Sequence, residues 1–396
     1  MQDPHAAHAE RVERFSLGAS VTVEQLTEDP LPVLDQLRIH EPVTWVPALG
    51  AWWVTDRQLV IEAMRDAERF TVDDERFTTA AILGPSMLSL DGPEHERHRS
   101  PFSADFRPKA VRQNAEAEVT AEAGRLVEAL GPNRAELRTQ LAGPLAVNTI
   151  TSFLGLGGVS SDEVLEWYGA IAHAITDLTV TGKVQPEDNA HVATAFERVG
   201  VAVDRADSDS FIGSVRDASP LNPVEVRTSA LVLLFGAIET SEAMTTNLFW
   251  FVLNTPGVWE ALQADRSLVP KAIEESLRIE PAASLIDRYT TADVQLGEVK
   301  IPSGELVTLS LLAANHDPET YAQPARFDLD RPNLRSHVTF VQGPHACLGL
   351  HLARAETQAA AIALLDRFDT LAIDHELTQG PNGLIFRKPD ALWVDW

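Results

Sequence analysis

One helix constrains the fold of this chain more than any other feature of its sequence. The residues from Pro223 to about Leu253 are mostly apolar and predict a single long helix. The sequence Asn-Thr-Pro-Gly at 254–257 ends it, because proline and glycine continue a helix poorly. From about Lys109 to Phe251, other stretches also carry apolar residues at three- and four-residue spacing. The sequence therefore predicts a mainly α fold with small β-sheets.

Short parts of the sequence near each end have β character. Val43 to Thr55 contains two β-prone runs around an Ala-Leu-Gly turn, and 293–312 contains short alternating segments with Leu-Gly and Pro-Ser-Gly turns. No repeat, low-complexity tract or flexible linker divides the chain, so we expect a single domain over residues 1–396. Its α-rich core is expected at about 90–290 and 345–370, and its β-containing parts at about 40–90, at about 285–340 and in the C-terminal loop.

The net charge of −26 argues against some classes of partner. So acidic a surface repels phosphate backbones and anionic lipids, so we expect neither nucleic-acid nor membrane binding. The N-terminus lacks the apolar segment of a secretory signal, and the longest apolar run stops at Glu239, too short for a membrane span. One stretch, Arg97 to Gln113, is basic. It is either a solvated helix face or a docking patch for an acidic partner.

Cys347 is the only cysteine in 396 residues, so it cannot form an internal disulfide. It precedes the last long helix, where unpaired backbone N–H groups stabilise an anion. The residue types leave open a buried inert thiol, a nucleophile and a metal ligand. His345 and His351 add the alternative of a Cys/His metal site, although no second Cys/His cluster completes a zinc shell.

The long helix contains an acid and an alcohol, Glu239 and Thr240, in its apolar middle. A buried ionisable group is unfavourable unless it is paired or functional. The Thr240 hydroxyl can bond the carbonyl of Gly236, four residues back, which would loosen the helix locally. The pair is a plausible proton-delivery route, although alone it is a weak signal.

Two further pairs lie at helical spacing. Glu275 and Arg278 are three residues apart, which usually indicates a surface ion pair. His95 and Arg99 are four apart, so their donors face the same way and could bind a carboxylate.

The order of these features along the chain resembles the cytochrome P-450 family of haem–thiolate enzymes, from about Leu90 to Arg387. The sequence from Phe340 to Glu356 is similar to the family's cysteine-ligand loop, with Val341 in place of a usual glycine. The Gly-Ala-Ile-Glu-Thr-Ser stretch from Gly236 is similar to the oxygen-activation turn, with its first two residues, Gly236 and Ala237, in the reverse of the usual order. Glu275 and Arg278 fit the family's Glu-x-x-Arg motif, and Arg326 would complete a buried ion network with them.

The resemblance implies a single-domain P-450 fold with haem b between the long central helix and the cysteine-ligand helix. Cys347 would be the axial iron ligand, whose electron donation favours O–O cleavage. Glu239 and Thr240 would deliver protons during oxygen activation. The implied haem-binding residues are Cys347, His95, Arg99, Arg288, His345, Phe340 and Gly349, of which His95, Arg99, Arg288 and His345 would hold the propionates. The implied substrate contacts are Leu83, Gly236, Ala237, Leu285, Ile286 and Ile385, and the implied docking residues are Arg97, Arg107, Lys109 and Arg112.

The implied function is that of a cytoplasmic, monomeric monooxygenase that inserts one atom of O₂ into a hydrophobic small molecule. Electrons would come from NAD(P)H through a ferredoxin reductase and a ferredoxin, because the chain has no room for a fused reductase. A peroxide-driven haem–thiolate oxidase or decarboxylase is an alternative, although such enzymes tend to lack the acid–alcohol pair. A haem-free Cys/His metal site is a second alternative.

Overall fold

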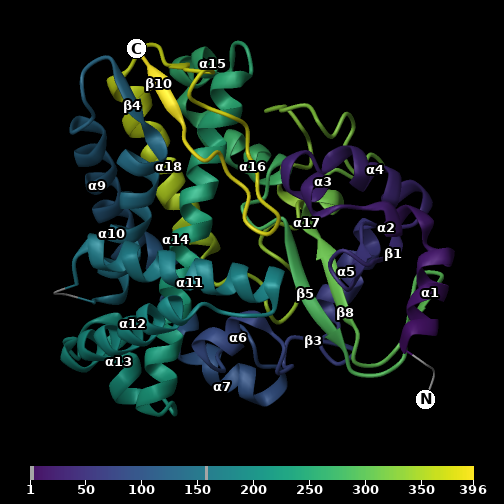
Figure 1. The fold of residues 1–396 in the computed structure, drawn as a ribbon. Helices are drawn as coiled ribbons and strands as arrows, with labels where there is room; N and C mark the ends of the chain where they lie inside the picture. Colours follow the sequence, from purple (N-terminus) through teal and green to yellow (C-terminus); the bar gives the residue numbers. More distant parts are fainter. Residues whose placement is uncertain (1–3, 157–158) are drawn as a thin grey trace. The chain divides into compact units, whose positions relative to one another are not determined.

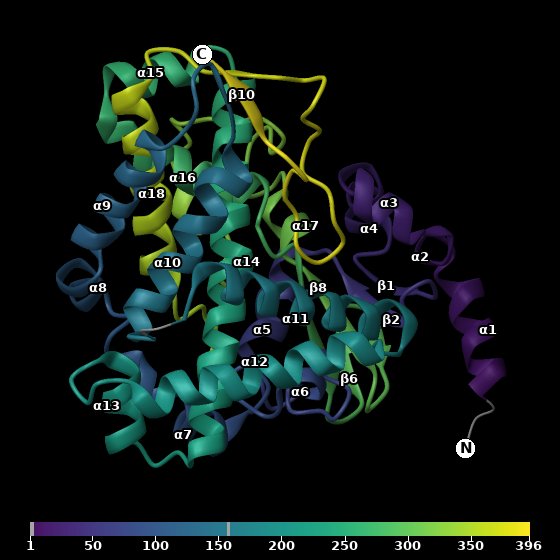
Figure 2. The ribbon, with the colours of Figure 1, turned by 60° about the vertical axis from the view of Figure 1, so that its left-hand side comes forward.

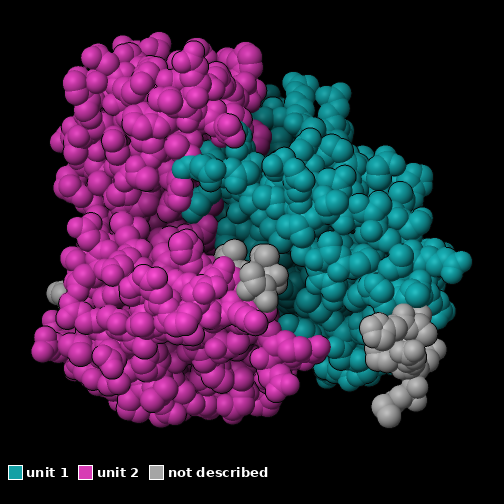
Figure 3. All heavy atoms as spheres, in the orientation of Figure 1, with its two compact units in different colours: residues 1–72, 274–347, 380–390 teal, residues 73–273, 348–379, 391–396 magenta. Residues whose placement is uncertain are grey.

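The structure is a computed structural model that describes residues 4–156 and 159–396 (Figure 1). These residues form two compact units, coloured separately in Figure 3. Unit 1 comprises residues 1–72, 274–347 and 380–390, and unit 2 comprises 73–273, 348–379 and 391–396, apart from the residues not described. Each unit is assembled from separate chain segments, so neither corresponds to a continuous stretch of sequence.

Unit 1 is built on a five-stranded sheet in the order β1-β2-β8-β5-β3. The predicted hairpin is present, with Val43 paired to Val54 and Val46 paired to Ala51. Strand β8 runs parallel to β2 and antiparallel to β5, and a separate two-stranded sheet joins β6 and β7. The strands are β1 (Val43–Val46), β2 (Ala51–Val54), β3 (Phe70–Thr71), β5 (Leu285–Thr290), β6 (Val294–Leu296), β7 (Val299–Ile301) and β8 (Leu306–Ser310).

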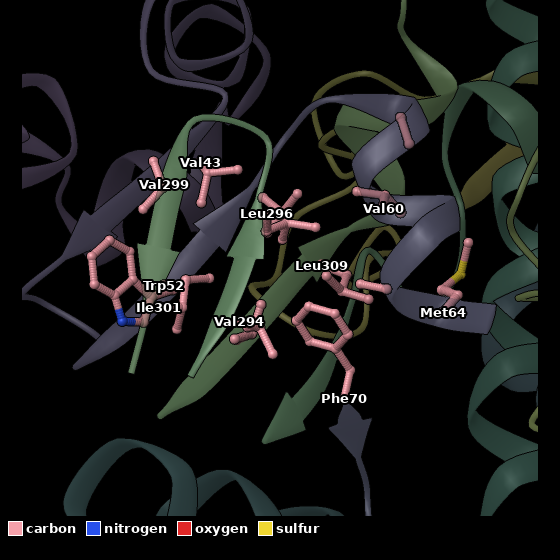
Figure 4. Close-up of a cluster of buried hydrophobic side chains, with 14 of the residues drawn as sticks. Val43, Trp52, Val60, Met64, Phe70, Val294, Leu296, Val299, Ile301 and Leu309 are labelled. Atoms are coloured by element: carbon pink, nitrogen blue, oxygen red, sulfur yellow. The ribbon is translucent and has the colours of Figure 1, made fainter. Parts of the chain in front are cut away.

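The core of unit 1 lies where the sheet meets α5 (Arg57–Arg65) and the β6–β7 hairpin (Figure 4). Side chains of Trp52, Phe70 and Leu309 fill it, and all are almost fully buried. Asp56 caps α5 by accepting a hydrogen bond from the backbone N–H of Leu59. The remaining helices are α1 (Pro4–Arg14), α2 (Ser16–Ser20), α3 (Val23–Glu28), α4 (Leu31–His40), α17 (Leu311–Asn315) and the 3₁₀ turn η3 (Leu334–Ser336).

Unit 2 is arranged around the long helix α14 (Pro223–Asn254), which α10 (Gly143–Leu154) and α18 (Leu350–Arg367) flank (Figures 1 and 2). Asn222 begins α14 in a capping box, since its side chain accepts from Glu225 N and the Glu225 side chain accepts from Asn222 N. The predicted bounds, Pro223 to about Leu253, agree with the structure to within a residue.

The other helices of unit 2 surround these three. They are α6 (Thr78–Leu83), α7 (Gly92–Ser103), α8 (Pro108–Asn114), α9 (Glu116–Glu128), the π-helical turn η1 (Arg138–Ala142), α11 (Ser161–Thr181), α12 (Pro186–Arg205), α13 (Phe211–Ala218), α15 (Val258–Ala264) and η2 (Arg266–Leu268). Helix α16 (Val269–Ile279) contains the point at which the chain passes from unit 2 to unit 1.

A three-stranded antiparallel sheet in unit 2 was not predicted. It has the order β4-β10-β9, with β4 (Arg134–Glu136), β9 (Ala372–Ile373) and β10 (Trp393–Asp395). Each strand has two or three residues, which is too short for an alternating pattern to show in the sequence. The predicted fold class, mainly α with small sheets, is confirmed. A single domain over 1–396 stays a prediction.

Candidate functional site

The loop before Cys347 belongs to unit 1 and is held in a tight conformation by its own backbone. The Cys347 N–H donates to the carbonyl of Phe340 at 2.8 Å, and the Ala346 N–H donates to that of Gly343 at 3.1 Å. Gly343 has φ +81°, and a Cβ there would lie 2.7 Å from the carbonyl oxygen of Met64. Only glycine fits such a position, so this residue sets the path of the loop. The Cys347 thiol at its end is half-buried.

Val341 occupies the loop position at which the family usually has glycine, and the structure shows why glycine is usual. Its φ is +60°, in the left-handed region that β-branched residues rarely adopt. The N–H of Val341 donates to the carbonyl of Val338 at 2.8 Å, and its side chain packs against the unit 1 core. The valine is therefore held in a strained backbone conformation by its surroundings.

Helix α18 begins at Leu350 and has Gly349 as its N-cap, so Cys347 lies just before the helix. The prediction that the last long helix starts just after the cysteine is confirmed. Gly349 has open space where a Cβ would be. The first backbone N–H groups of α18 have no partner within the helix, so they favour an anion at this position.

One face of α14 is open in the middle of an otherwise buried helix. Leu233, Gly236, Ala237 and Thr240 recur at three- and four-residue spacing and are at least partly exposed within unit 2, whereas Ile238 and Glu239 beside them are buried. A Cβ at Gly236 would meet no atom within 4 Å. This stripe provides a surface on which a flat or apolar group could rest.

Thr240 makes the backbone contact that the sequence predicted. Its Oγ1 donates a hydrogen bond of 2.6 Å to the carbonyl oxygen of Gly236. Glu239, the adjacent acid, is only 5% exposed. The two side chains of the pair thus point to different sides of the helix, the alcohol to the open stripe and the acid to the packed interior.

The four predicted carboxylate-binding residues fall into two pairs. His95 and Arg99 lie one turn apart on α7 in unit 2, with His95 buried and Arg99 half-buried. Arg288 and His345 belong to unit 1. Arg288 is 4% exposed on β5, where its Nη1 donates to the carbonyl of Asp287 at 2.7 Å. The pKa of the neighbouring Asp287 carboxyl is raised, because its burial outweighs the opposing effects of a hydrogen bond from Thr308 and of the charge of Arg288.

The predicted substrate contacts also divide between the units. In unit 2, Leu83 ends α6 and is buried, while Gly236 and Ala237 lie on the open stripe of α14. In unit 1, the structure brings Leu285 and Ile385 together, since Ile385 packs against the core cluster that contains Leu285. Ile286 follows Leu285 on β5 and packs against the other cluster of unit 1, because successive strand residues point to opposite faces.

The buried ion network forms, but with a different third member from the one predicted. Arg278 makes two hydrogen bonds of 2.8 Å to Glu275, and both residues are fully buried. Arg331 donates to Glu275 at 3.0 Å, whereas Arg326 is exposed and contributes only its backbone carbonyl. The prediction of Arg326 is therefore wrong. The chain turns between the two arginines, and that turn directs Arg331 inward.

The predicted docking residues differ in their exposure and in their ion pairs. Arg107, Lys109 and Arg112 are exposed in and beside α8. Arg97 lies on α7 and is bound to Glu225 at 2.6 Å and to Glu94 at 2.8 Å, so its charge is already neutralised. Arg112 borders a groove of about 360 Å³ between α8, α9 and α18.

His351 and Arg354 of α18 also line that groove, where sequence reasoning did not place them. Burial, together with the positive charges of Arg354 and Arg112, lowers the pKa of His351. Both residues follow Cys347 within two helical turns, so their position next to the thiol in sequence was the available signal.

A buried acid on α18 was also missed. Glu356 is 1% exposed, and its Oε2 has no hydrogen-bond partner within the protein. Burial raises the pKa of Glu356 to about 8, although a hydrogen bond with Ser241 of α14 lowers it in part. The carboxyl is therefore protonated at neutral pH. The signal for it was a glutamate on the apolar face of a helix.

The described residues do not support a Cys/His metal site. Among residues 4–156 and 159–396, no group of three or more His, Cys, Asp or Glu side chains could hold a metal ion. The alternative with His345, Cys347 and His351 is accordingly not supported. A haem–thiolate group fits the residues better, because the thiol is accessible at the end of a rigid loop, Gly236 and Gly349 leave open space, and His95, Arg99, Arg288 and His345 carry donors suited to carboxylates.

Comparison with known proteins agrees with this fit. Residues 204–389 match the family model described as Cytochrome P450. The chain is 32% identical to cytochrome P450 107B1 of Saccharopolyspora erythraea, over 80% of this chain and 76% of that protein. It is 30% identical to cytochrome P450 monooxygenase PikC of Streptomyces venezuelae, over 94% and 92%. The solved structure of the cytochrome P450 enzyme CxnD superposes with a TM-score of 0.86 at 26% identity, over 95% of this chain and 97% of that one.

The chain belongs to the cytochrome P450 family. It is thus a haem-containing oxidoreductase that incorporates oxygen from O₂ into small molecules and takes its electrons from a redox partner. The haem-free alternative is wrong, since the family carries haem. No helix in the described ranges 4–156 and 159–396 combines the length and apolar character that a membrane span needs.

Proposed function

We propose that this chain is a haem b monooxygenase in which Cys347 is the axial ligand, and that NAD(P)H supplies its electrons through a ferredoxin reductase and a ferredoxin. The observation that carries the proposal is the geometry of the Phe340–Cys347 loop, whose hydrogen bonds and Gly343 turn present one accessible thiol before α18. The haem, once bound, supplies the oxygen-activating chemistry of the reaction.

Cys347 is suited to act as a thiolate. Its N–H donates to the carbonyl of Phe340, which holds the backbone of Cys347 in place. The unpaired N–H groups at the start of α18 favour the negative charge on sulfur. Phe340 and Gly349 would border a bound haem, and Gly349 leaves space where any larger residue would place a Cβ.

Glu239 and Thr240 hold and move protons in this proposal. The Thr240 hydroxyl donates a hydrogen bond to the carbonyl of Gly236, so its oxygen can still accept a hydrogen bond on the open stripe. Glu239, buried beside it, is the acid that supplies the proton. His95, Arg99, Arg288 and His345 bind the propionates, because each offers charged or ring N–H donors to a carboxylate.

The substrate is a hydrophobic small molecule. Leu83, Gly236, Ala237, Leu285, Ile286 and Ile385 are the proposed contacts, all of them apolar or without a side chain. Among the relatives, the names nocardicin C N-oxygenase, erythromycin C-12 hydroxylase and C-19 steroid 1alpha-hydroxylase describe different scaffolds, which supports the reaction type rather than one substrate. We further propose a cytoplasmic monomer.

The ferredoxin docks on the face that carries Arg107, Lys109 and Arg112. Arg112 and Arg354 line the groove beside α18 together with Glu116, and the two arginines give this face local positive charge on a chain of net charge −26. Complementary charge steers an acidic partner and sets the salt dependence of its binding. Arg97 is a weaker member of this face, because Glu94 and Glu225 already neutralise it.

The proposal is tested by reconstitution. Compounds that shift the haem Soret band are first selected from a hydrophobic library, and turnover is then measured with ferredoxin, its reductase and NAD(P)H, or with hydrogen peroxide alone. We expect product only with the redox partners, and weaker partner binding at higher salt. Arg112→Glu should raise the ferredoxin Kd, whereas Arg205→Glu, an equal charge change at an exposed site on α12, should not. Faster turnover with peroxide than with the partners would favour the peroxide-driven alternative.

A further inference from the structure

Arg138 is a basic residue next to the buried acid of the Glu239–Thr240 pair, and the sequence did not single it out. It begins η1, a π-helical turn packed against α14. Its Nε donates a hydrogen bond to the carboxylate of Glu242. Glu242 follows Glu239 by three residues, so the two acids share a face of α14. Short π-helical turns are rare and often occur at functional sites.

The charges of three carboxylates act on the Arg138 guanidinium. Burial acts to lower the pKa of Arg138, yet that pKa is raised, because the charges of Glu242, Glu239 and Glu136 favour the cation. The oxygens of the Glu136 carboxylate accept hydrogen bonds from three backbone N–H groups, those of Arg138 at 3.0 Å, Thr139 at 2.8 Å and Leu392 at 2.7 Å. The Arg138 side chain donates a hydrogen bond to Glu242, and Glu239 acts on it through its charge.

Gly143 at the start of α10 borders this ion pair. A Cβ there would lie 3.5 Å from Oε2 of Glu242, an ordinary contact, and 3.3 Å from the backbone carbonyl oxygen of Arg138.

The cluster reaches solvent through its cation. The Arg138 side chain is 27% exposed, while that of Glu242 is 6% exposed and Glu239 is 5% exposed. Arg138 is therefore the most exposed of these three residues.

Among residues 4–156 and 159–396, other titratable groups lie on helices packed against α14. Helices α10 and α6 contribute none, since their sequences contain no ionisable side chain. Helix α18 presents Glu356 to Ser241, helix α11 presents Tyr168 to Phe235, and helix α12 presents Asp204 to Arg227, three turns before Glu239. Arg138 is a cation whose charge bears on Glu239.

We propose that Arg138 and Glu242 form a positioning pair for Glu239, which sets the pH at which Glu239 takes up its proton and marks the solvent end of the proton's route. The positive charge of Arg138 favours the Glu239 carboxylate, whereas the negative charge of Glu242 favours the protonated acid. The pair keeps these opposed effects in balance. This inference rests on the proposed role of Glu239 and Thr240 in proton delivery.

The two charges can be tested separately, because their removal acts in opposite directions. In Glu242→Gln, Glu239 faces an uncompensated cation, so its half-protonation pH should fall by about one unit. In Arg138→Gln it should rise by a similar amount. The double variant R138Q/E242Q should return close to the wild type. A loss of structure alone would not move the titration in opposite directions.

The measurement is the titration of the Glu239 carboxyl carbon by ¹³C NMR in the reduced, carbon monoxide-bound holoenzyme. The resonance is assigned by its loss in Glu239→Gln. Product formed per NAD(P)H is followed against pH in the same variants. Arg227→Gln serves as the control. Arg227 lies on α14, like Glu239, but its ion pair is with Asp204 of α12, so its loss should leave the titration of Glu239 unchanged.

The outcomes are distinct. Opposite shifts in the two single variants support the inference. If Arg138→Gln does not fold, a higher half-protonation pH in R138Q/E242Q than in Glu242→Gln isolates the charge of Arg138 and supports it equally. An unchanged titration in Glu242→Gln and in the double variant overturns it. A Thr240→Ala variant that stays fully coupled would instead contradict the proposed proton-delivery role, whatever the titration shows.

Discussion

The hydroxyl of Thr240 donates a 2.6 Å hydrogen bond to the carbonyl oxygen of Gly236, one turn earlier in α14. This bond fixes the alcohol at the edge of the open stripe formed by Leu233, Gly236, Ala237 and Thr240. It also commits the hydroxyl proton to the backbone, so the oxygen can only accept a hydrogen bond from whatever lies on that stripe.

Replacing the alcohol should therefore separate electron consumption from product formation. In Thr240→Ala we expect product per NAD(P)H to fall by about tenfold, with the missing reducing equivalents recovered as hydrogen peroxide. Thr240→Ser keeps the hydroxyl and should retain most of the coupling. Equal coupling in the alanine and serine variants would contradict a role for the hydroxyl. Product and peroxide are quantified in the same reaction.

Arg331 and Arg326 should differ in their contribution to the free energy of unfolding. Arg331→Gln removes a buried partner of Glu275 and should lower the free energy of unfolding by about 3 kcal/mol. Arg326→Gln changes an exposed side chain and should lie within about 0.5 kcal/mol of the wild type. Denaturant unfolding of both variants checks this. A larger loss in Arg326→Gln would restore the original prediction.

Because the backbone of Val341 is strained, its replacement by glycine should change the free energy of unfolding little. Val341→Gly relieves a φ of +60° but loses partly buried packing and adds freedom to the unfolded chain, so we expect a net change within about 1 kcal/mol. Val338→Gly, in the same cluster and 1% exposed, has no strain of this kind to relieve and should cost about 3 kcal/mol. Similar losses in the two variants would mean that the Val341 backbone is not strained.

Glu356 should make stability depend on pH. Its pKa is raised by burial from 4.5 to about 8, so between these values the folded chain holds a proton that the unfolded chain releases. The free energy of unfolding should then fall as pH rises, by about 1.4 kcal/mol per unit from this group. Glu356→Gln should remove that slope, whereas Glu128→Gln, at an exposed position, should keep it. Parallel pH profiles for wild type and Glu356→Gln would show that Glu356 ionises normally.

Local sequence patterns predicted the elements whose formation depends on their own residues. The bounds of α14 were predictable from its apolar length and from the Pro-Gly sequence after it. The Thr240–Gly236 bond was predictable because it needs only helical spacing. The start of α18 after Cys347 was predictable for the same reason.

Contacts between distant segments could not be predicted in the same way. Arg326 and Arg331 are both arginines near one buried carboxylate, and only the turn between them decides which side chain points inward. Arg138 is far from Glu242 in sequence, so nothing local to either residue indicates their pairing. The short strands β4 and β10 are likewise far apart in sequence, and they pair only in the folded chain.

The central claim is that Cys347 binds the haem iron, and the spectrum of the reduced, carbon monoxide-treated holoenzyme tests it most directly. We predict the red-shifted Soret band of a thiolate-ligated haem in the wild type and its loss in Cys347→Ser, with haem still bound. An unshifted band in the wild type, or a shifted band that survives in Cys347→Ser, would contradict the assignment.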